Sequence, residues 1–199
     1  MVAAKTIAAF QRTLVSPRAS FDDYLQALLT ENKAAQQSYP DEAIRGLKLF
    51  IGEGNCHVCH FGPNFSNTEF HDTGRPFFTG VGRVDPGRHS GVLRVRADPY
   101  NLLGRFNGTM VRQERQKTQT VKLGQVNFGQ WRTPGLRGLT DTAPYMHDGS
   151  LPTLRAVVDS YADVDPTRLH TQGEALIKPL SWSDADRQAV VLLLQTLSD

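Results

Sequence analysis

Cysteine is scarce in this chain: its 199 residues include only two, and both lie in the stretch EGNCHVCHFGP at positions 53–63. Long apolar runs are missing too. No stretch approaches the roughly 20 residues that a membrane-spanning helix needs, so the sequence predicts no span. The first residues, MVAAKTIAAFQRTLV, lack the apolar run of a signal peptide. With 39% hydrophobic and 21% charged residues, the composition is that of one good-sized globular domain.

The net charge is only +2, but the charge is distributed unevenly. Residues 75–137 hold 12 Lys or Arg against 3 Asp or Glu, whereas the rest of the chain holds 10 against 17. A basic segment can indicate a nucleic-acid surface. Here the arginines stand singly among Gly, Asn, Thr and Phe, without a known binding motif, so no nucleic-acid partner is expected. The sequence favours a solvated basic region, in which some arginines pair with anionic groups of a bound cofactor.

Apolar residues recur at helical spacing near both ends of the chain. Helix-capping residues mark where several of these segments begin. The predicted helices are about 2–15; SFDDYLQALL, with Ser20 as N-cap and Asp23 in the capping box; YPDEAIRGLKLFIGEG; GSLPTLRAVVDSYAD, with Ser150 as N-cap; and SWSDADRQAVVLLLQTLSD, with Ser183 as N-cap and Asp186 in the box.

The middle of the chain, about residues 61–140, shows little periodicity and is punctuated throughout by Gly, Pro, Asn and Thr. GVLRVRA, at residues 91–97, alternates weakly and is a candidate short strand. So long an irregular stretch is unusual in a compact domain. The segment is therefore expected either to be disordered or to be organised around a group that is not protein.

Three interpretations compete for CHVCH, residues 56–60. A C-x-x-C redox pair would open a helix beside a βαβ unit, a pattern that is not present around this motif. A zinc site typically has a second ligand pair, and the histidines at positions 71, 89, 147 and 170 form none. C-x-x-C-H is also the attachment signature of a c-type haem. In that interpretation Cys56 and Cys59 form thioethers to the haem and His60 is the proximal iron ligand.

Three stretches carry a family resemblance: LFIGEGNCHVCHFGPNFSNTEFHDTG, FGQWRTPGLRGLTDTAPYMHDGSLPTLRAVVDSY and PLSWSDADRQAVVLLLQTL. Together they resemble the C-terminal half of the bacterial di-haem cytochrome c peroxidase and MauG superfamily, and TAPYMHDGSLPTL is a specific motif. The resemblance implies a mainly α, cytochrome c-like domain with long irregular loops wrapped around one covalent c-type haem. Residues 1–37 are similar to the helical linker between the two haem domains of those enzymes, and residues 38–199 to the haem domain.

The chain departs from that superfamily in one respect. Its members carry two haem-attachment motifs, and this sequence has one. A fragment, a split subunit and a single-haem relative all account for the difference, and a second haem domain or a redox protein is the expected partner. Because thioether attachment takes place outside the cytoplasm, the resemblance also implies an exported, periplasmic protein.

The resemblance names a candidate for the second iron ligand. A methionine or a tyrosine stands in those enzymes at the position of Tyr161, which therefore implies a haem ligated by His60 and Tyr161. Without the resemblance, Tyr161 would be interpreted as a core residue of an apolar helix face. Met146 is the alternative ligand, because thioether sulfur is a common haem ligand.

Further site residues are implied by position in the same motifs. His71 is a candidate for the haem pocket, and Arg132 and Arg137 are candidates to contact the haem propionates. Thr142 and Pro144 match positions whose backbone carbonyls bind calcium in the superfamily, a metal that prefers oxygen ligands. Trp131 and Trp182 are interpreted as core residues.

Two functions follow as expectations. The first is electron transfer by a c-type haem protein within a MauG-like or peroxidase-like oxidoreductase system, with both axial positions of the iron filled. The second is a haem peroxidase that reduces hydrogen peroxide at a five-coordinate haem or one with a labile ligand. A haem-free module that uses the cysteines for a metal is a third class.

Overall fold

The computed structural model describes residues 2–75, 78–108, 111–165 and 177–198, which are mainly α-helical. The sequence prediction of a mainly α protein with long irregular loops is confirmed. None of the helices in these ranges combines the length and the apolar character needed to cross a membrane. The helices and strands are α1 (Val2–Gln11), α2 (Ser20–Leu29), α3 (Lys33–Gln37), α4 (Asp41–Ile51), η1 (Cys56–Val58), β1 (Phe70–Asp72), β2 (Phe78–Gly80), β3 (Arg83–Val84), α5 (Arg88–Ala97), α6 (Arg112–Gln119), η2 (Gln125–Asn127), β4 (Gln130–Arg132), η3 (Leu139–Asp141), α7 (Leu154–Ala162) and α8 (Asp184–Gln195).

The described residues form two units. Residues 15–69, 133–165 and 177–198 make up the first, called here the motif unit because it contains CHVCH. Residues 2–14 and 70–132 make up the second, called the basic unit, in which 13 Lys or Arg stand against 4 Asp or Glu. The motif unit has the opposite balance, 8 against 14. The predicted boundary between residues 37 and 38 stays a prediction.

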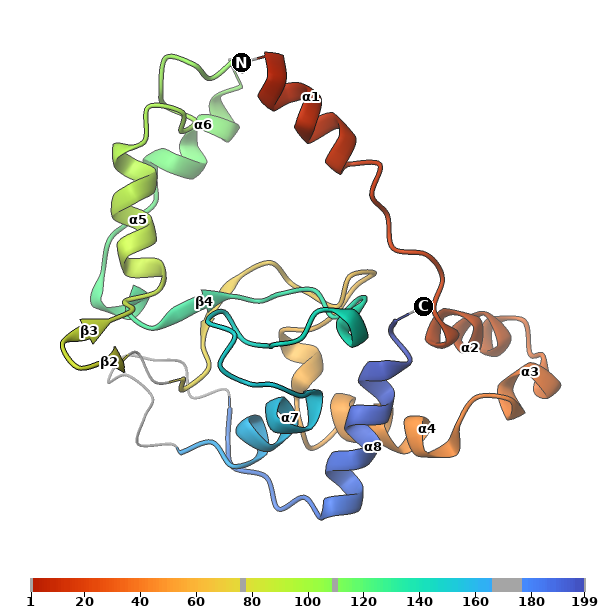
Figure 1. Cartoon of the computed structure of the whole chain (residues 1–199). Helices are drawn as coiled ribbons and strands as arrows, with labels where there is room; N and C mark the ends of the chain where they lie inside the picture. Colours follow the sequence, from red (N-terminus) through yellow and green to blue (C-terminus); the bar gives the residue numbers. More distant parts are fainter. Residues whose placement is uncertain (1, 76–77, 109–110, 166–176, 199) are drawn as a thin grey trace. The chain divides into compact units, whose positions relative to one another are not determined.

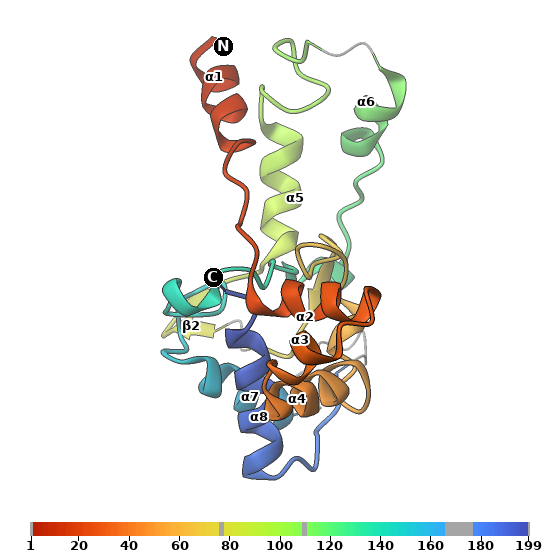
Figure 2. The same cartoon turned by 90° about the vertical axis from the view of Figure 1, so that its right-hand side faces the viewer.

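The hydrophobic core belongs to the motif unit, where α4, α7 and α8 pack together (Figures 1 and 2). α8 buries the apolar stripe that its sequence predicts. Ser183 begins it as N-cap, and Asp186 completes the capping box, as predicted. The buried members of the core include Phe21, Tyr24, Tyr39, Phe50, Leu136, Leu154, Val158, Trp182, Val190, Val191, Leu193, Leu194 and Leu197.

The basic unit contains little apolar core. Among its described residues, Val92 is the one buried hydrophobic side chain, while Asp72, Thr118, Asn127 and Gln130 are buried polar residues. Its strands are short antiparallel pairs, β1 with β4 and β2 with β3. Hydrophobic burial therefore stabilises this unit weakly.

The sequence prediction was wrong in several local details. GVLRVRA lies in a helix, α5, and not in a strand. The alternation was too short to separate the two states, and the helix buries Val92 while Leu93 and Val95 stay exposed. α1 ends at Gln11, before residue 15.

Two predicted caps were wrong as well. Ala19 is the N-cap of α2, and its backbone N–H donates to Asp22, so Ser20 lies inside the helix. Thr153 caps α7 and accepts a hydrogen bond from the N–H of Ala156, in place of Ser150. Each correction moves a helix start by one to three residues, a shift that the many Ser, Thr and Asp residues near these ends allow.

The crossing of α4 and α8 depends on Gly46. A Cβ added at this residue would lie 2.1 Å from the carbonyl oxygen of Ala189 and 3.1 Å from the Cβ of Leu193. Gly46→Ala is therefore expected to lower the free energy of unfolding by about 1–3 kcal/mol through overpacking. Urea unfolding followed by far-UV circular dichroism measures the change.

Gly91 provides the matched control. It is also a helical glycine, in α5, but a Cβ there would meet no atom within 4 Å. Gly91→Ala should stabilise the protein by up to about 1 kcal/mol, the difference in helix propensity between the two residues. If the two substitutions had the same effect, α4 and α8 would not be in the close contact described.

Candidate haem site

The CHVCH motif lies on a single tight turn directly after α4. Gly52 ends the helix, the N–H of Gly54 donates to the carbonyl of Leu49 at 2.9 Å, and Asn55 adopts a left-handed conformation with φ 50°. η1 follows, and the N–H groups of Cys59 and His60 both donate to the carbonyl of Cys56, at 3.3 and 2.9 Å. Side chains three residues apart eclipse one another in such a turn. Both cysteines therefore leave the backbone on the same side.

His60 is held by a hydrogen bond that selects its tautomer. Its Nδ1 lies 2.8 Å from the carbonyl oxygen of Phe65. Because a carbonyl only accepts, Nδ1 carries the proton and Nε2 carries the lone pair. This is the arrangement that orients a metal-binding histidine and raises its basicity.

The loop after His60 is closed by its own backbone. The N–H of Ser66 donates to the carbonyl of Phe61 at 2.9 Å, and the N–H of Asn67 donates to the carbonyl of Cys59 at 2.8 Å. Phe65, inside the loop that these hydrogen bonds close, has a left-handed backbone conformation with φ 51°. The loop therefore places the accepting carbonyl of Phe65 where His60 can reach it.

The thiols do not have the character of a redox pair. The two cysteines form no disulfide with each other, and burial raises the pKa of Cys56 to about 11. Reactive C-x-x-C pairs instead depend on a lowered thiol pKa. No cluster of three His, Cys, Asp or Glu side chains that could hold a metal ion occurs among the described residues. The chemistry of this turn therefore fits a covalent haem better than a disulfide or a zinc ion.

Trp182 packs directly against this turn. A Cβ at Gly54 would lie 2.8 Å from its ring, so only glycine allows this contact. The indole Nε1 is buried and has no hydrogen-bond partner among the described residues. A buried donor without a partner is costly, and a bound group that carries acceptors would satisfy it. The prediction that Trp182 is a core residue is confirmed.

Tyr161 lies in the last turn of α7 and is half-buried. Val158 and Ala162 of the same helix belong to the core against which Cys56 also packs. The carbonyl of Ala162 accepts a hydrogen bond from the N–H of Leu180 at 2.8 Å, which ties the end of α7 to the segment that leads to Trp182. Tertiary packing thus brings Cys56 and the helix of Tyr161 to one core, although 106 positions separate Cys56 from Ala162 in the sequence.

Met146 lies at the turn of a small loop. Tyr145 and Leu151 pair through two backbone hydrogen bonds of 2.7 and 3.3 Å, and the hydroxyl of Tyr145 donates to the carbonyl of Leu139 at 2.7 Å. Between the paired residues, Met146 has φ 71° and its side chain is half-buried. The two candidate ligands, Met146 and Tyr161, thus both belong to the motif unit.

Comparison with known proteins agrees with this geometry. Residues 130–165 match the RoxA-like, cytochrome c-like family. The chain is 30% identical over 206 aligned residues to the cytochrome-c peroxidase IdrP1 of Pseudomonas sp. (strain SCT), covering 98% of this chain and 48% of that protein. It is 32% identical to the methylamine utilization protein MauG of Methylorubrum extorquens, covering 96% and 42%.

The solved structures agree as well. A MauG-like protein associated with microbial copper homeostasis superposes with a TM-score of 0.64 and 25% identity, over 97% of this chain and 51% of that one. The chain belongs to the di-haem cytochrome c peroxidase and MauG superfamily. The diheme peroxidase BthA from Burkholderia thailandensis shares the fold, with a TM-score of 0.55 over 92% of this chain and 46% of that one, at 19% identity.

Membership of the superfamily confirms the predicted family and fold and supports haem c as the cofactor. The chain spans about half the length of the curated relatives that it matches. IdrP1 is a cytochrome-c peroxidase by name, and both the electron-transfer and the peroxidase interpretation agree with membership of this superfamily.

Arg137 occupies a defined position in the motif unit. Its two terminal nitrogens donate to the two carboxylate oxygens of Asp22, each at 2.7 Å, its Nε donates to the carbonyl of Pro63, and its guanidinium lies over the ring of Phe65. The hydrogen bond from Arg137 lowers the pKa of Asp22 below 3.8. The pair therefore stabilises the fold at neutral pH, and this contribution is lost as the pH falls through the lowered pKa.

The other predicted site residues fall in different places. Thr142 and Pro144 are exposed in the motif unit. His71 and Arg132 belong to the basic unit, where β1 pairs with β4, placing His71 opposite Trp131 and Arg132 opposite Phe70. Trp131 is only half-buried. The assignments of these residues to calcium, the haem pocket and the propionates stay predictions.

Two contributors to the site could not be recognised from the sequence. The carbonyl of Phe65 orients His60, and no side-chain signal could have revealed it because every residue carries a carbonyl. Arg187 was also missed. Its Nε donates to the carbonyl of Trp182, and its terminal nitrogens reach carboxylates of α7. An arginine on the polar side of a predicted helix is ordinary in sequence, so only the fold identifies its partners.

Proposed function

We propose that this chain binds one haem through Cys56 and Cys59, with His60 as the proximal and Tyr161 as the distal iron ligand. The observation that carries the proposal is the turn of the motif itself. Two thiols leave it on one side, and the hydrogen bond from His60 to Phe65 leaves the lone pair on Nε2, the nitrogen that would bind the iron. When bound, the haem supplies one-electron redox chemistry.

The proposed role is electron transfer within a MauG-like or di-haem-peroxidase-like oxidoreductase system. His60 and Tyr161 would together fill both axial positions, so neither side would be open to peroxide. A phenolate oxygen is a hard, anionic donor and favours ferric iron, so Tyr161 would lower the reduction potential relative to a methionine ligand. Axial ligands tune haem potentials over roughly 0.8 V.

The second candidate is a peroxidase, and the names of the relatives favour it, since IdrP1 is called a cytochrome-c peroxidase. In that case the iron has five ligands or a labile sixth. The reactivity of the isolated chain with hydrogen peroxide separates the two candidates. Stopped-flow absorption of the haem-loaded protein should show no rapid change on mixing with peroxide if Tyr161 occupies the distal position. A rapid, saturable change would instead support the peroxidase.

Several finer assignments belong to the same proposal. Arg132 and Arg137 are proposed to contact propionates, His71 to line the pocket, and the carbonyls of Thr142 and Pro144 to bind calcium. In the structure, the three guanidinium nitrogens of Arg137 already donate to Asp22 and Pro63. A redox protein or a second haem domain is the proposed partner. Export to the periplasm is proposed because c-type haem is attached there.

A further inference from the structure

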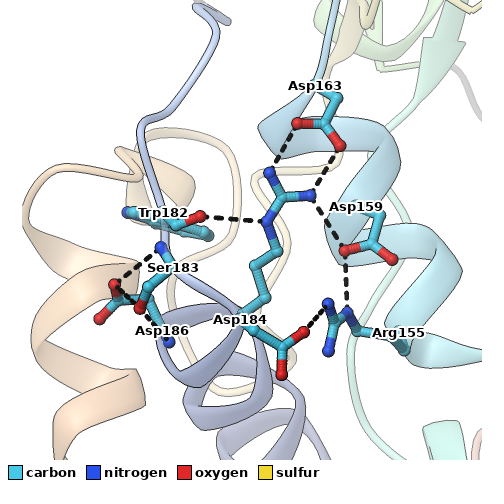
Figure 3. Close-up of polar contacts among 8 residues, drawn as sticks. Arg155, Asp159, Asp163, Trp182, Ser183, Asp184 and Asp186 are labelled. Atoms are coloured by element: carbon cyan, nitrogen blue, oxygen red, sulfur yellow. Dashed lines mark hydrogen bonds and ion pairs between the residues drawn. The ribbon is translucent and has the colours of Figure 1, made fainter.

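A network of ion pairs joins α7 to the start of α8 (Figure 3). Arg187 donates from both terminal nitrogens to the carboxylate of Asp163, each at 2.6 Å, and from one of them to Asp159 at 3.1 Å. Arg155 donates to the same oxygen of Asp159 at 2.8 Å and also to Asp184. Asp159 therefore links the two arginines.

The two aspartates flank the proposed distal ligand. Asp159 and Asp163 each lie two positions from Tyr161, one before it and one after it. Asp163 is also the C-cap of α7, and its N–H donates to the carbonyl of Asp159 at 2.8 Å. Arg187 thus holds the final turn of α7 on both sides of Tyr161.

The guanidinium of Arg187 also contacts the segment that packs against the cysteine turn. Its Nε donates to the carbonyl of Trp182 at 3.3 Å, and the ring of Trp182 packs against Gly54, two residues before Cys56. One side chain therefore connects the turn that carries Tyr161 to a residue that packs against the cysteine turn.

The ion pairs of Arg187 have a geometry that should contribute measurably to the stability of this part of the fold. Isolated surface ion pairs contribute little, but bidentate arginine–carboxylate pairs in a network are the exception. The side chain of Arg187 is only 16% exposed. Lysine cannot reproduce this contact, because its single ammonium lacks the planar fork.

We infer that Arg187 is a positioning residue: by joining Asp159 and Asp163 to the backbone of Trp182, it sets the place of Tyr161 relative to the cysteine turn. The inference rests on the proposed ligand role of Tyr161. It assigns to Arg187 no contact with the haem. The residue acts through the helix end that it holds.

The test uses the haem-loaded protein with Arg187→Gln. The ferric absorption and electron paramagnetic resonance spectra should show a larger high-spin fraction. Azide should bind the ferric haem about tenfold more tightly, a change of about 1.4 kcal/mol. The covalent haem should remain, as intact mass shows. Arg187→Lys should behave like Arg187→Gln, because the charge stays but the fork is lost.

Arg45→Gln is the matched control. Arg45 pairs with Asp186 at 2.7 Å between α4 and α8 and has no part in holding α7, so the same loss of charge should leave the spectra and azide affinity unchanged. If Arg187→Gln does not fold, Asp163→Asn tests the inference in its place. This variant keeps Arg187 and removes the carboxylate charge at the end of α7. It too should raise the high-spin fraction.

Three results would overturn the inference. Unchanged spectra in Arg187→Gln or Asp163→Asn, with a clear change in Tyr161→Phe, would refute the positioning role and leave the ligand assignment intact. An equal effect of Arg45→Gln would show a general loosening of the fold. Unchanged spectra in Tyr161→Phe would remove the proposed ligand, and the inference would fall with it.

Discussion

Changing both Cys56 and Cys59 to alanine is expected to leave residues 61–140 largely disordered. Most of this segment belongs to the basic unit, whose described residues bury a single apolar side chain, Val92. A segment with so little buried apolar surface cannot offset the conformational entropy of ordering by packing alone. The haem is expected to supply the missing contacts, so its loss should leave this segment without an ordered core.

Hydrogen exchange measured by mass spectrometry tests this expectation. In the double variant, amides of residues 61–140 should exchange with a free energy of opening near zero. α4 and α8 should keep more protection, because their crossing is formed by protein side chains. His57→Ala is the control, since this exposed residue lies inside the motif but takes no part in attachment. A haem-free variant that resists proteolysis throughout residues 61–140 would contradict the prediction.

Tyr161→Phe should open the iron of the haem-loaded protein to water and small anions. The phenol normally titrates near pH 10, but the charge of ferric iron favours the phenolate at neutral pH. The wild-type ferric protein is therefore expected to have nitrogen and oxygen axial ligands and to lack the charge-transfer band of a methionine sulfur. The substitution should convert much of the haem to the high-spin form and raise the reduction potential, which spectroelectrochemistry measures.

Two controls accompany this substitution. Met146→Leu should change the spectrum little, although the side chain lies in a strained turn of the same unit. Tyr39→Phe removes the hydroxyl of a buried core tyrosine that hydrogen-bonds to Thr196 at 2.7 Å, and it should leave the haem spectrum unchanged. If Met146→Leu opens the iron and Tyr161→Phe does not, the methionine is the ligand.

The sequence alone determined the features that depend on neighbouring residues. Ser183 and Asp186 predicted the start of α8, because a capping box is complete within four residues. The apolar stripe of α8 predicted which of its side chains lie in the core. The spacing of Cys56, Cys59 and His60 matched the attachment signature of a c-type haem, and the family motif predicted the superfamily.

Tertiary structure decided what depends on residues far apart in the chain. A few alternating residues in GVLRVRA do not distinguish a strand from a helix, so the sequence alone could not assign this segment. In the fold it is helical and buries Val92. The tautomer of His60 depends on which carbonyl the following loop brings within 2.8 Å. The partners of Arg187 lie 24 and 28 positions away, on another helix. Local sequence signals report the conformation of one turn, whereas a site is assembled by the packing of distant segments, and that packing depends on the whole fold.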